Sequence, residues 1–159
     1  YRFQRLLTFI NPQGEELGAS YHITQSLMAI GSGGLLGIGF GQSKAKLLYL
    51  PEAHTDSIFA IIVEELGFIR AILVILMFVL IAWRGLKIAK NAPDEFARLL
   101  SVGIVGWIVI QTFINMSAML GVMPLTGIPM PFVSYGGSSL VVLLAAVGIL
   151  TNISKQANR

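Results

Sequence analysis

The sequence predicts an all-α integral membrane protein, a polytopic helical bundle, and two observations carry that prediction: composition and the length of the apolar segments. Hydrophobic residues make up 55% of the 159 positions and charged residues only 12%, and the mean hydropathy is +0.76. A soluble globular domain carries about 25% charged residues. Three apolar segments have lengths that suit a bilayer crossing. Only helices can span in this context, because lipid offers no partner for free backbone groups.

Residues 1–55 are the least hydrophobic third of the chain, and we expect them to form a long extracytoplasmic loop. Within this loop, residues 21–30 carry apolar side chains at helical spacing, and glycines follow, as they do at helix ends. About ten residues of helix rise only about 15 Å, too little to cross a bilayer. We therefore predict a short interfacial or re-entrant helix here.

Residues 56–159 are predicted to form three transmembrane helices. We expect these helices at about residues 58–83, 99–123 and 132–153, joined by a cytoplasmic loop over 84–98 and an outer hairpin over 121–136. Basic side chains gather between the first two helices and after the third: Arg84, Lys87, Lys90, Arg98, Lys155 and Arg159. The positive-inside rule places these segments in the cytoplasm, so the long loop and the hairpin face the other side.

The remaining compositional signals mainly exclude functions. The chain starts at Tyr1 without the features of a signal peptide, and we expect it to be part of a longer polypeptide. The net charge of +3 is modest and the basic residues form no single face, which argues against binding of nucleic acid. There are no cysteines, and the two histidines fit no metal signature, which excludes thiol catalysis and argues against a zinc site.

Three ionisable side chains, Glu52, His54 and Asp56, stand just before the apolar run that begins at Ser57. Polar groups at a membrane border are costly to hold and are usually functional. Asp56 could instead be only a helix N-cap, whose side chain accepts hydrogen bonds from backbone N–H groups of the first turn. The two roles can coexist. We favour the functional one, because a cap does not require two further ionisable groups beside it.

Two pairs of polar residues lie inside the apolar segments. Glu64 and Glu65 fall on different sides of the helix that follows Asp56, so at least one should face protein. There we favour a polar contact with another helix over a supporting role for Glu64 at the site. Gln111 and Asn115 are four residues apart and share a face, where hydrogen bonds to another helix explain them.

A glycine-rich segment, residues 31–41, invites a phosphate-loop interpretation. Its sequence, GSGGLLGIGFG, matches neither the dinucleotide-binding pattern nor the P-loop pattern. We therefore expect its glycines to permit tight turns and close packing at the membrane surface. Lys44 and Lys46 follow and could hold a phosphate as point charges, and a solvated basic loop explains them equally well.

The predicted outer hairpin is rich in proline, glycine and hydroxyl groups. Residues 123–139 read MPLTGIPMPFVSYGGSS and cannot form a regular helix. Irregular backbone is tolerated at membrane depth only where it is buried in protein or lines a cavity. We favour a cavity over a simple tight connection, and we expect Asp56 and nearby hydroxyls to line it together: Ser134, Tyr135, Ser138 and Ser139.

Several separated motifs, in the right order, resemble the shape, elongation, division and sporulation (SEDS) family of peptidoglycan polymerases, which comprises FtsW, RodA and SpoVE. They are Tyr49-Leu-Pro-Glu-Ala-His-Thr-Asp56 with Glu64-Glu65-Leu-Gly-Phe68, and Gly127-Ile-Pro-Met-Pro-Phe-Val-Ser-Tyr-Gly-Gly-Ser-Ser139. The upstream Ser20-Tyr-His-Ile-Thr-Gln-Ser-Leu27 and Ala29-Ile-Gly-Ser-Gly-Gly34 look most like the FtsW and SpoVE branch. The resemblance covers essentially the whole chain. It implies a fold of ten membrane helices, of which this chain is the part from the outer loop before the eighth helix through the tenth.

The resemblance also implies an activity: inverting glycosyl transfer from lipid II, an undecaprenyl-diphosphate-linked disaccharide-pentapeptide, to a growing glycan. It implies septal wall synthesis at the extracytoplasmic face of the bacterial inner membrane, with Asp56 as the catalytic base. Basic residues or a divalent cation, Mg²⁺ or Mn²⁺, would offset the diphosphate charge. The expected partners are a class B penicillin-binding transpeptidase, other division membrane proteins and the lipid bilayer. The remaining residues expected near the substrate are Glu52, His54, Lys44, Lys46, Ser134, Tyr135, Gly136, Gly137, Ser138 and Ser139.

The chain departs from the family pattern at three positions. Ser57 stands where the family usually has Phe, Arg70 where a small residue is common, and Thr126 where some members have Lys. Ser57 therefore calls into question the packing beside Asp56, and no charge contact can be carried over to Thr126. Two other functions stay open: a transporter that flips lipid II, suggested by the intramembrane polar residues, and a scaffold that only recruits the transpeptidase.

Overall fold

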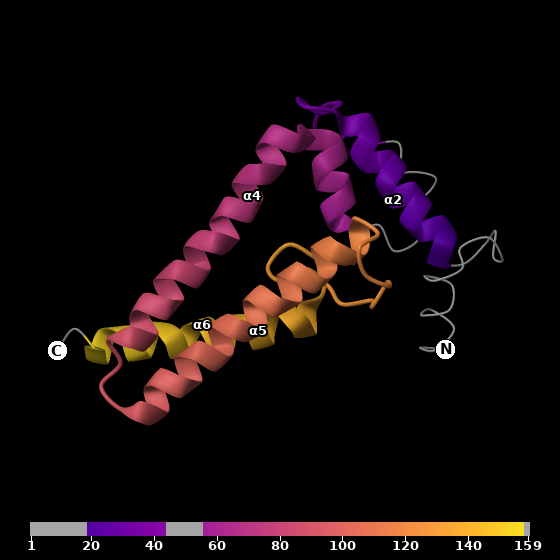
Figure 1. Ribbon diagram of the computed structural model, residues 1–159. Coiled ribbons are helices and arrows are strands. Elements are labelled where there is room, and N and C mark those ends of the chain that lie inside the picture. The colour runs from indigo at the N-terminus through magenta and orange to yellow at the C-terminus, as the bar shows by residue number, and fades with distance from the viewer. Residues whose placement is uncertain (1–18, 44–55, 158–159) are drawn as a thin grey trace.

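The computed structural model describes residues 19–43 and 56–157, and within these ranges the chain is all helical, without a strand. The helices are α2 (Ala19–Gly33), α4 (Ile58–Lys90), α5 (Glu95–Met119) and α6 (Gly137–Ala157). The last three are long and apolar enough to cross a membrane. Figure 1 shows them fanning out from one end of the molecule, where α4 and α6 end and α5 begins. The predicted all-α membrane architecture is confirmed, and the chain is a membrane protein.

Helix α4 consists of two limbs that meet at a sharp reversal. Gly67 has φ 80° and ψ 169°, far outside helical values. The short limb, residues 58–66, runs from the end of α5 to the apex of the molecule, and the long limb, residues 68–90, runs back down its whole length (Figure 1). The long limb rises roughly 35 Å, enough for the ~30 Å hydrocarbon core. The structure therefore differs from the expected single span over 58–83. Its first part turns away from the long limb, and the helix continues to Lys90, because the basic residues after Trp83 do not break a helix.

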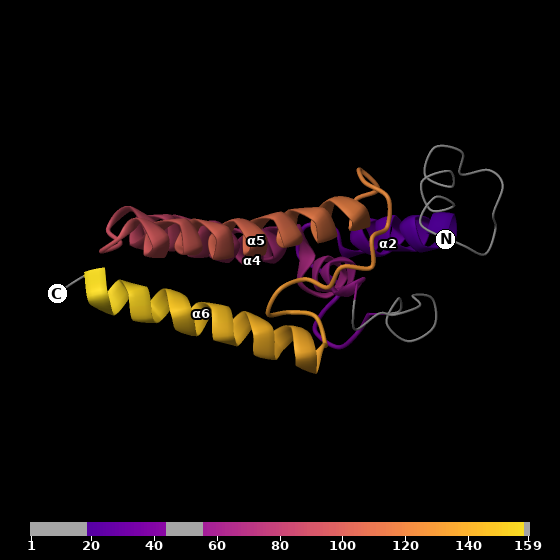
Figure 2. The ribbon, with the colours of Figure 1, turned by 90° about the horizontal axis from the view of Figure 1, so that it is seen from below.

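The long limb of α4 packs against α5 most closely at the end where basic side chains gather, which we call the basic end. There Gly85 faces Val105, and a Cβ on Gly85 would overlap that valine side chain. Helix α6 forms a second layer that approaches α4 near the basic end and diverges from it toward Gly137 (Figure 2). One apolar core joins both limbs, the three long helices and the hairpin: Phe59, Val63, Phe78, Ile108, Met130 and Leu143 are among its buried members.

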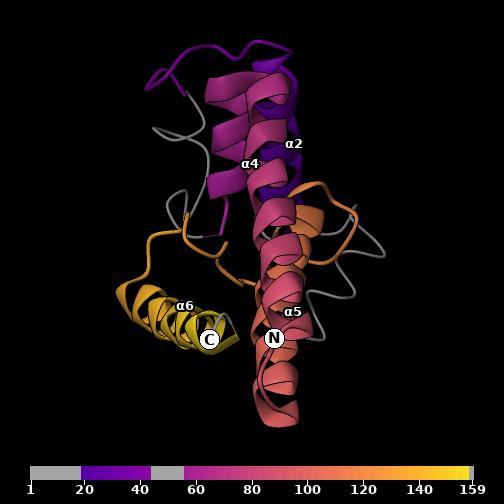
Figure 3. The ribbon, with the colours of Figure 1, turned by 90° about the vertical axis from the view of Figure 1, so that its left-hand side faces the viewer.

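Helix α2 lies beside the short limb of α4 (Figures 1 and 3). Ala29 of α2 packs against Ala60 and Ile61 in a small separate core. The helix ends at Gly33, and Gly34 follows with a φ of 53°. This confirms the short helix that the sequence predicted over residues 21–30, with its glycine end. The short limb is thus covered by α2 on one side.

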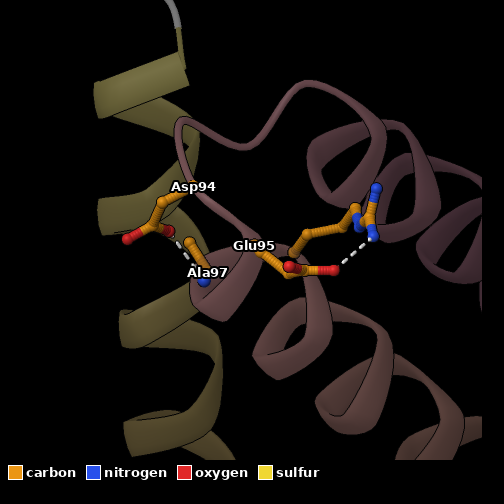
Figure 4. Close-up of polar contacts among 4 residues, drawn as sticks. Asp94, Glu95 and Ala97 are labelled. Carbon is orange, nitrogen blue, oxygen red and sulfur yellow. Dashed lines mark hydrogen bonds and ion pairs between the residues drawn. The ribbon is translucent and has the colours of Figure 1, made fainter.

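Helix α5 begins four residues earlier than predicted because Asp94 caps it. The Asp94 carboxylate accepts a hydrogen bond from the Ala97 N–H at 2.8 Å, and one residue on, Glu95 forms an ion pair of 3.1 Å with Arg98 (Figure 4). With α4 running to Lys90, the connection at the basic end is only residues 91–94. It is much shorter than the predicted loop over 84–98, because charged residues at a membrane border can continue a helix into water.

The hairpin between α5 and α6 is irregular throughout, as the sequence predicted. Gly121 and Gly127 each have a φ of 68°, and Phe132 has a φ of 63° within a turn. That turn delays α6 until Gly137, five residues later than expected. The hairpin and the start of the short limb both lie at the end of α5 away from the basic end, which we call the Asp56 end (Figure 1).

Candidate functional site

Asp56 stands immediately before the short limb of α4 and is partly exposed. The N-cap of the helix is the next residue, Ser57, whose side chain makes no capping hydrogen bond. The structure thus places Ser57, and not Asp56, at the N-cap position. Ser57 is buried, 1% exposed, so a small side chain fits where the family usually carries Phe. The acidic residue lies at the entrance of the limb without being part of the helix.

Asn115 ties Asp56 to the hairpin. Its side-chain amide, Nδ2, donates hydrogen bonds to the backbone oxygens of Asp56 at 3.0 Å and Ile128 at 2.8 Å. Asn115 is 2% exposed, so both bonds are shielded from water. One turn earlier on α5, the Gln111 amide donates to the Pro129 oxygen at 2.8 Å. The expected hydrogen bonds to another helix are thus replaced by bonds to irregular backbone, whose carbonyls lack helical partners and need donors at membrane depth.

The hydroxyl residues of the hairpin separate into different roles. Ser134 Oγ accepts a hydrogen bond from the Met130 N–H at 2.7 Å and thereby closes the turn around buried Met130. Tyr135 is 82% exposed. Gly136 and Gly137 lead into α6, and Ser138 and Ser139 lie in its first turn. The structure brings Asp56 together with the hairpin at Ile128. A cavity shared by Asp56 and the hydroxyls stays a prediction, as do the roles of Lys44, Lys46, Glu52 and His54, which lie outside the described residues.

The reversal at Gly67 is held by backbone hydrogen bonds to the glycine-rich segment. In an unbroken helix the N–H groups of Phe68 and Ile69 would donate to the carbonyls of Glu64 and Glu65. Here they donate instead to Gly34 O at 3.0 Å and Leu35 O at 3.3 Å. The two freed carbonyls accept from other residues of the same segment, Ile38 N at 3.0 Å and Gly39 N at 3.1 Å. Two helical bonds are thus exchanged for four bonds to the loop.

Two glycines make this exchange possible. A Cβ on Gly37 would overlap the Glu65 oxygen, and a Cβ on Gly67 would overlap the backbone of Gly37. Both residues also have a positive φ, 83° and 80°, a region that favours glycine. The predicted role of these glycines in turns and close packing is confirmed for Gly37. Gly67 was not foreseen, although an isolated glycine inside an apolar helix pattern is a signal of such a break.

Both glutamates of the short limb are buried, Glu64 at 3% and Glu65 at 7% exposed. The Glu64 carboxylate accepts hydrogen bonds from Ser43 Oγ and, at 3.5 Å, from Ser32 Oγ of α2. The predicted contact of Glu64 with another helix is confirmed, and the contact to Ser43 adds a bond beyond α2. Together with the backbone exchange, these contacts fix the short limb that follows Asp56.

A divalent cation at this site stays a prediction. Within the described ranges, no group of three or more His, Asp or Glu side chains could hold a metal ion. The candidate ligands beside Asp56 in the sequence, Glu52 and His54, lie outside those ranges. We therefore assign no step of the reaction to a metal.

The geometry and the motifs agree with what comparison with known proteins finds. The sequence profile of the FtsW, RodA and SpoVE family, described as "Cell cycle protein", matches residues 1–159. The chain belongs to this family. It is 50% identical over 155 residues to stage V sporulation protein E of Bacillus subtilis, covering 98% of this chain and 42% of that protein. It is 46% identical over 154 residues to a probable peptidoglycan glycosyltransferase FtsW of Geobacter metallireducens, covering 97% of this chain and 41% of the relative.

Solved structures of the family share the fold. One, from a peptidoglycan synthase complex described as "Structural coordination of polymerization and crosslinking", matches with a TM-score of 0.74 at 27% identity, over 97% of this chain and 41% of that one. Another, an aspartate-to-alanine mutant of the rod shape determining protein RodA of Thermus thermophilus, matches with a TM-score of 0.64 at 32% identity, over 84% of this chain and 40% of that one. The chain thus spans about two fifths of the length of the relatives it matches.

Proposed function

We propose that the complete protein is a peptidoglycan glycosyltransferase that polymerises lipid II into glycan strands in septal wall synthesis during cell division. Family membership supports the reaction class, and the relative from Geobacter metallireducens is named for that activity. One observation in the structure carries the proposal: Asp56 is partly exposed at the start of the short limb, and Asn115 ties its backbone to an irregular hairpin. A carboxylate held in this way can meet a substrate at the membrane surface.

In the proposed reaction Asp56 acts as a general base. The acceptor hydroxyl oxygen bonds to the anomeric carbon of the donor while the bond from that carbon to the diphosphate oxygen breaks. The electron pair leaves with undecaprenyl diphosphate, the proton passes to the Asp56 carboxylate, and the anomeric centre is inverted. We assign Lys44 and Lys46 to the diphosphate charge and place Glu52 and His54 beside the substrate. The exposed Tyr135 and the first turn of α6, with Ser138 and Ser139, are proposed to contact the lipid-borne sugar.

The location and partners follow from the same proposal. The positive-inside rule puts the basic end in the cytoplasm and therefore Asp56 at the extracytoplasmic face of the inner membrane. A class B penicillin-binding transpeptidase is the proposed partner, and similarity to the solved peptidoglycan synthase complex, which joins polymerisation to crosslinking, supports it. Whether the protein acts at the division septum or in sporulation is tested by the position of a fluorescent fusion in growing and sporulating cells. Confinement to sporulating cells would contradict the septal role.

The other two functions lose some of their motivation. Lipid II flipping was suggested by Gln111, Asn115 and Glu64, but all three side chains bond to the protein itself. A scaffold that only recruits the transpeptidase would not need Asp56 at all. The scaffold therefore predicts that the Asp56 side chain is dispensable, whereas the transporter predicts flipping of lipid II without polymerisation.

The decisive experiment changes Asp56→Ala and Asp56→Asn in the complete purified protein and measures glycan polymerisation from lipid II. We expect a loss of at least roughly 100-fold in rate, as for removal of a general base. Glu95→Gln is the matched control, because this exposed carboxylate lies at the basic end; it should keep the full rate. Undiminished polymer from both Asp56 variants would end the proposal, and lipid II flipping without polymerisation in vesicles would favour the transporter.

A further inference from the structure

A pocket at the basic end lies between the last turns of α4 and α6. It has a volume of about 230 Å³ and is lined by Arg84, Lys87, Ile88 and Asn91 of α4 or its end, and by Ser154 and Ala157 of α6. The two helices approach each other at this end of the molecule (Figures 1 and 2). The pocket is far along the chain from Asp56, and the proposed reaction makes no use of it.

The cations of this pocket have no acidic partner among the residues that the structure describes. Of the two acidic residues of the adjoining turn, Asp94 caps α5 and Glu95 pairs with Arg98. Within the described part of the chain, neither Arg84 nor Lys87 forms an ion pair. Both cations instead lie over the Trp83 ring, 5.5 Å and 5.8 Å from its centroid. Each helix C-terminus carries about half a negative charge, so two full positive charges leave the pocket positive.

The pocket also contains a neutral hydrogen-bond donor, the hydroxyl of Ser154. Elsewhere in the helices, the hydroxyls of Ser101, Thr112 and Thr151 donate to a backbone carbonyl of the preceding turn. Ser154 makes no such bond to any of the described residues, although it sits in the same helix as Thr151 and lines the pocket. Its hydroxyl is left to donate into the pocket, where Arg84 and Lys87 already favour an acceptor that carries negative charge.

The position of the pocket relative to the membrane indicates which molecule carries the negatively charged acceptor. Trp83, one residue before Arg84, is 58% exposed and belongs at the interface between the hydrocarbon core and the headgroups. Basic pockets between membrane helices on the cytoplasmic side suit the headgroups of anionic lipids. We propose that this pocket binds the phosphate of an anionic glycerophospholipid of the cytoplasmic leaflet, with Arg84 and Lys87 as counter-charges and Ser154 as hydrogen-bond donor.

The test measures lipid binding to the complete protein in detergent by native mass spectrometry, with dioleoyl phosphatidylglycerol as the probe and dioleoyl phosphatidylcholine as the uncharged comparison. The variant Arg84→Gln with Lys87→Gln should weaken phosphatidylglycerol binding roughly tenfold or more. The matched control, Lys90→Gln with Lys155→Gln, removes the same charge from exposed residues outside the pocket. It should stay within about twofold of the unchanged protein.

A second pair of variants separates a built site from general surface charge. Ser154→Ala changes no charge and should weaken phosphatidylglycerol binding several-fold, while Thr151→Ala, one turn earlier and bonded to its own helix, should have no effect. Equal losses in the two charge variants, or no loss in Ser154→Ala, would overturn the proposal. Displacement of the lipid by millimolar inorganic phosphate would overturn the assignment to lipid, because the pocket would then recognise the free ion.

Discussion

The two ends of the molecule handle polar groups in opposite ways. At the Asp56 end the backbone is irregular, and the side chains of Asn115 and Gln111 are used to satisfy its carbonyls. At the basic end the backbone is regular helix up to a short capped turn, and Arg84 and Lys87 keep their charges available. At the Asp56 end, side chains stabilise an irregular backbone. At the basic end, a regular helical backbone presents charged side chains.

The difference has an energetic basis. A buried carbonyl without a donor costs about 1–3 kcal/mol, so each irregular turn at the Asp56 end depends on the particular donor that reaches it. A helix satisfies its own backbone, so changes of polar side chains at the basic end remove only a cap or an exposed charge. Substitutions of polar groups should therefore lower stability and polymerisation far more at the Asp56 end than at the basic end.

The largest effect is expected at the reversal of α4. Gly67→Ala places a Cβ against the backbone of Gly37 at a φ of 80°. Such a conformation costs an L-residue about 1–3 kcal/mol before any overlap is counted. We expect α4 to straighten locally, Asp56 to be displaced, and glycan polymerisation by the complete protein to fall close to background.

If Gly67→Ala does not fold, two further variants still test the prediction. Gly37→Ala tests the other side of the same contact and should reproduce the loss of polymer. Gly31→Ala lies in the same glycine-rich segment with nothing within 4 Å of its added Cβ, and it should keep the rate and the thermal stability. Full polymerisation by Gly37→Ala would show that the close approach of the two backbones does not position Asp56.

A smaller effect is expected at Asn115, which we assign as a positioning residue for Asp56. Asn115→Ala leaves the carbonyls of Asp56 and Ile128 without their donor, a cost of about 1–3 kcal/mol each. Gln111→Ala is the matched control, because it frees only the Pro129 carbonyl of the hairpin. Both changes should lower thermal stability, but only Asn115→Ala should lower kcat of polymerisation strongly, by roughly tenfold, with KM little changed. Equal kcat in the two variants would leave Asn115 a purely structural residue.

The sequence predicted the class of this fold well and its irregular parts only in outline. Apolar segments of sufficient length predict membrane helices, because in lipid the backbone must satisfy its own polar groups. Basic loops then predict the orientation of those helices. Helix ends were missed, since Arg84, Lys87 and Lys90 mark the membrane border and do not stop a helix. The reversal at Gly67 depends on pairing with residues 34–39, about 30 positions away, and no local pattern contains that partner.

The candidate site shows the same division. Asp56 could be singled out as a candidate because three ionisable groups stand together directly before an apolar run, where holding them is costly. The hairpin could be singled out because its prolines exclude a regular helix. The partners of Asn115 could not be foreseen, because spacing along α5 shows which face it shares with Gln111 but not what lies opposite. The tertiary fold decides that those partners are backbone carbonyls.

The smallest effect is expected at the basic end, where Asp94→Ala removes the cap of α5. The lost hydrogen bond to the Ala97 N–H should cost about 1 kcal/mol of stability, seen as a modest fall in the unfolding temperature of the complete protein. Glu95→Gln removes only an exposed ion pair, which contributes at most about 1 kcal/mol and often nothing measurable. Polymerisation should be unchanged in both, because the contacts that hold Asp56 all lie away from the basic end. A clear loss of polymerisation rate in Asp94→Ala, at a temperature where the variant is still folded, would mean that the two ends are coupled along α5. The two ends would then differ in their chemistry but would not act independently.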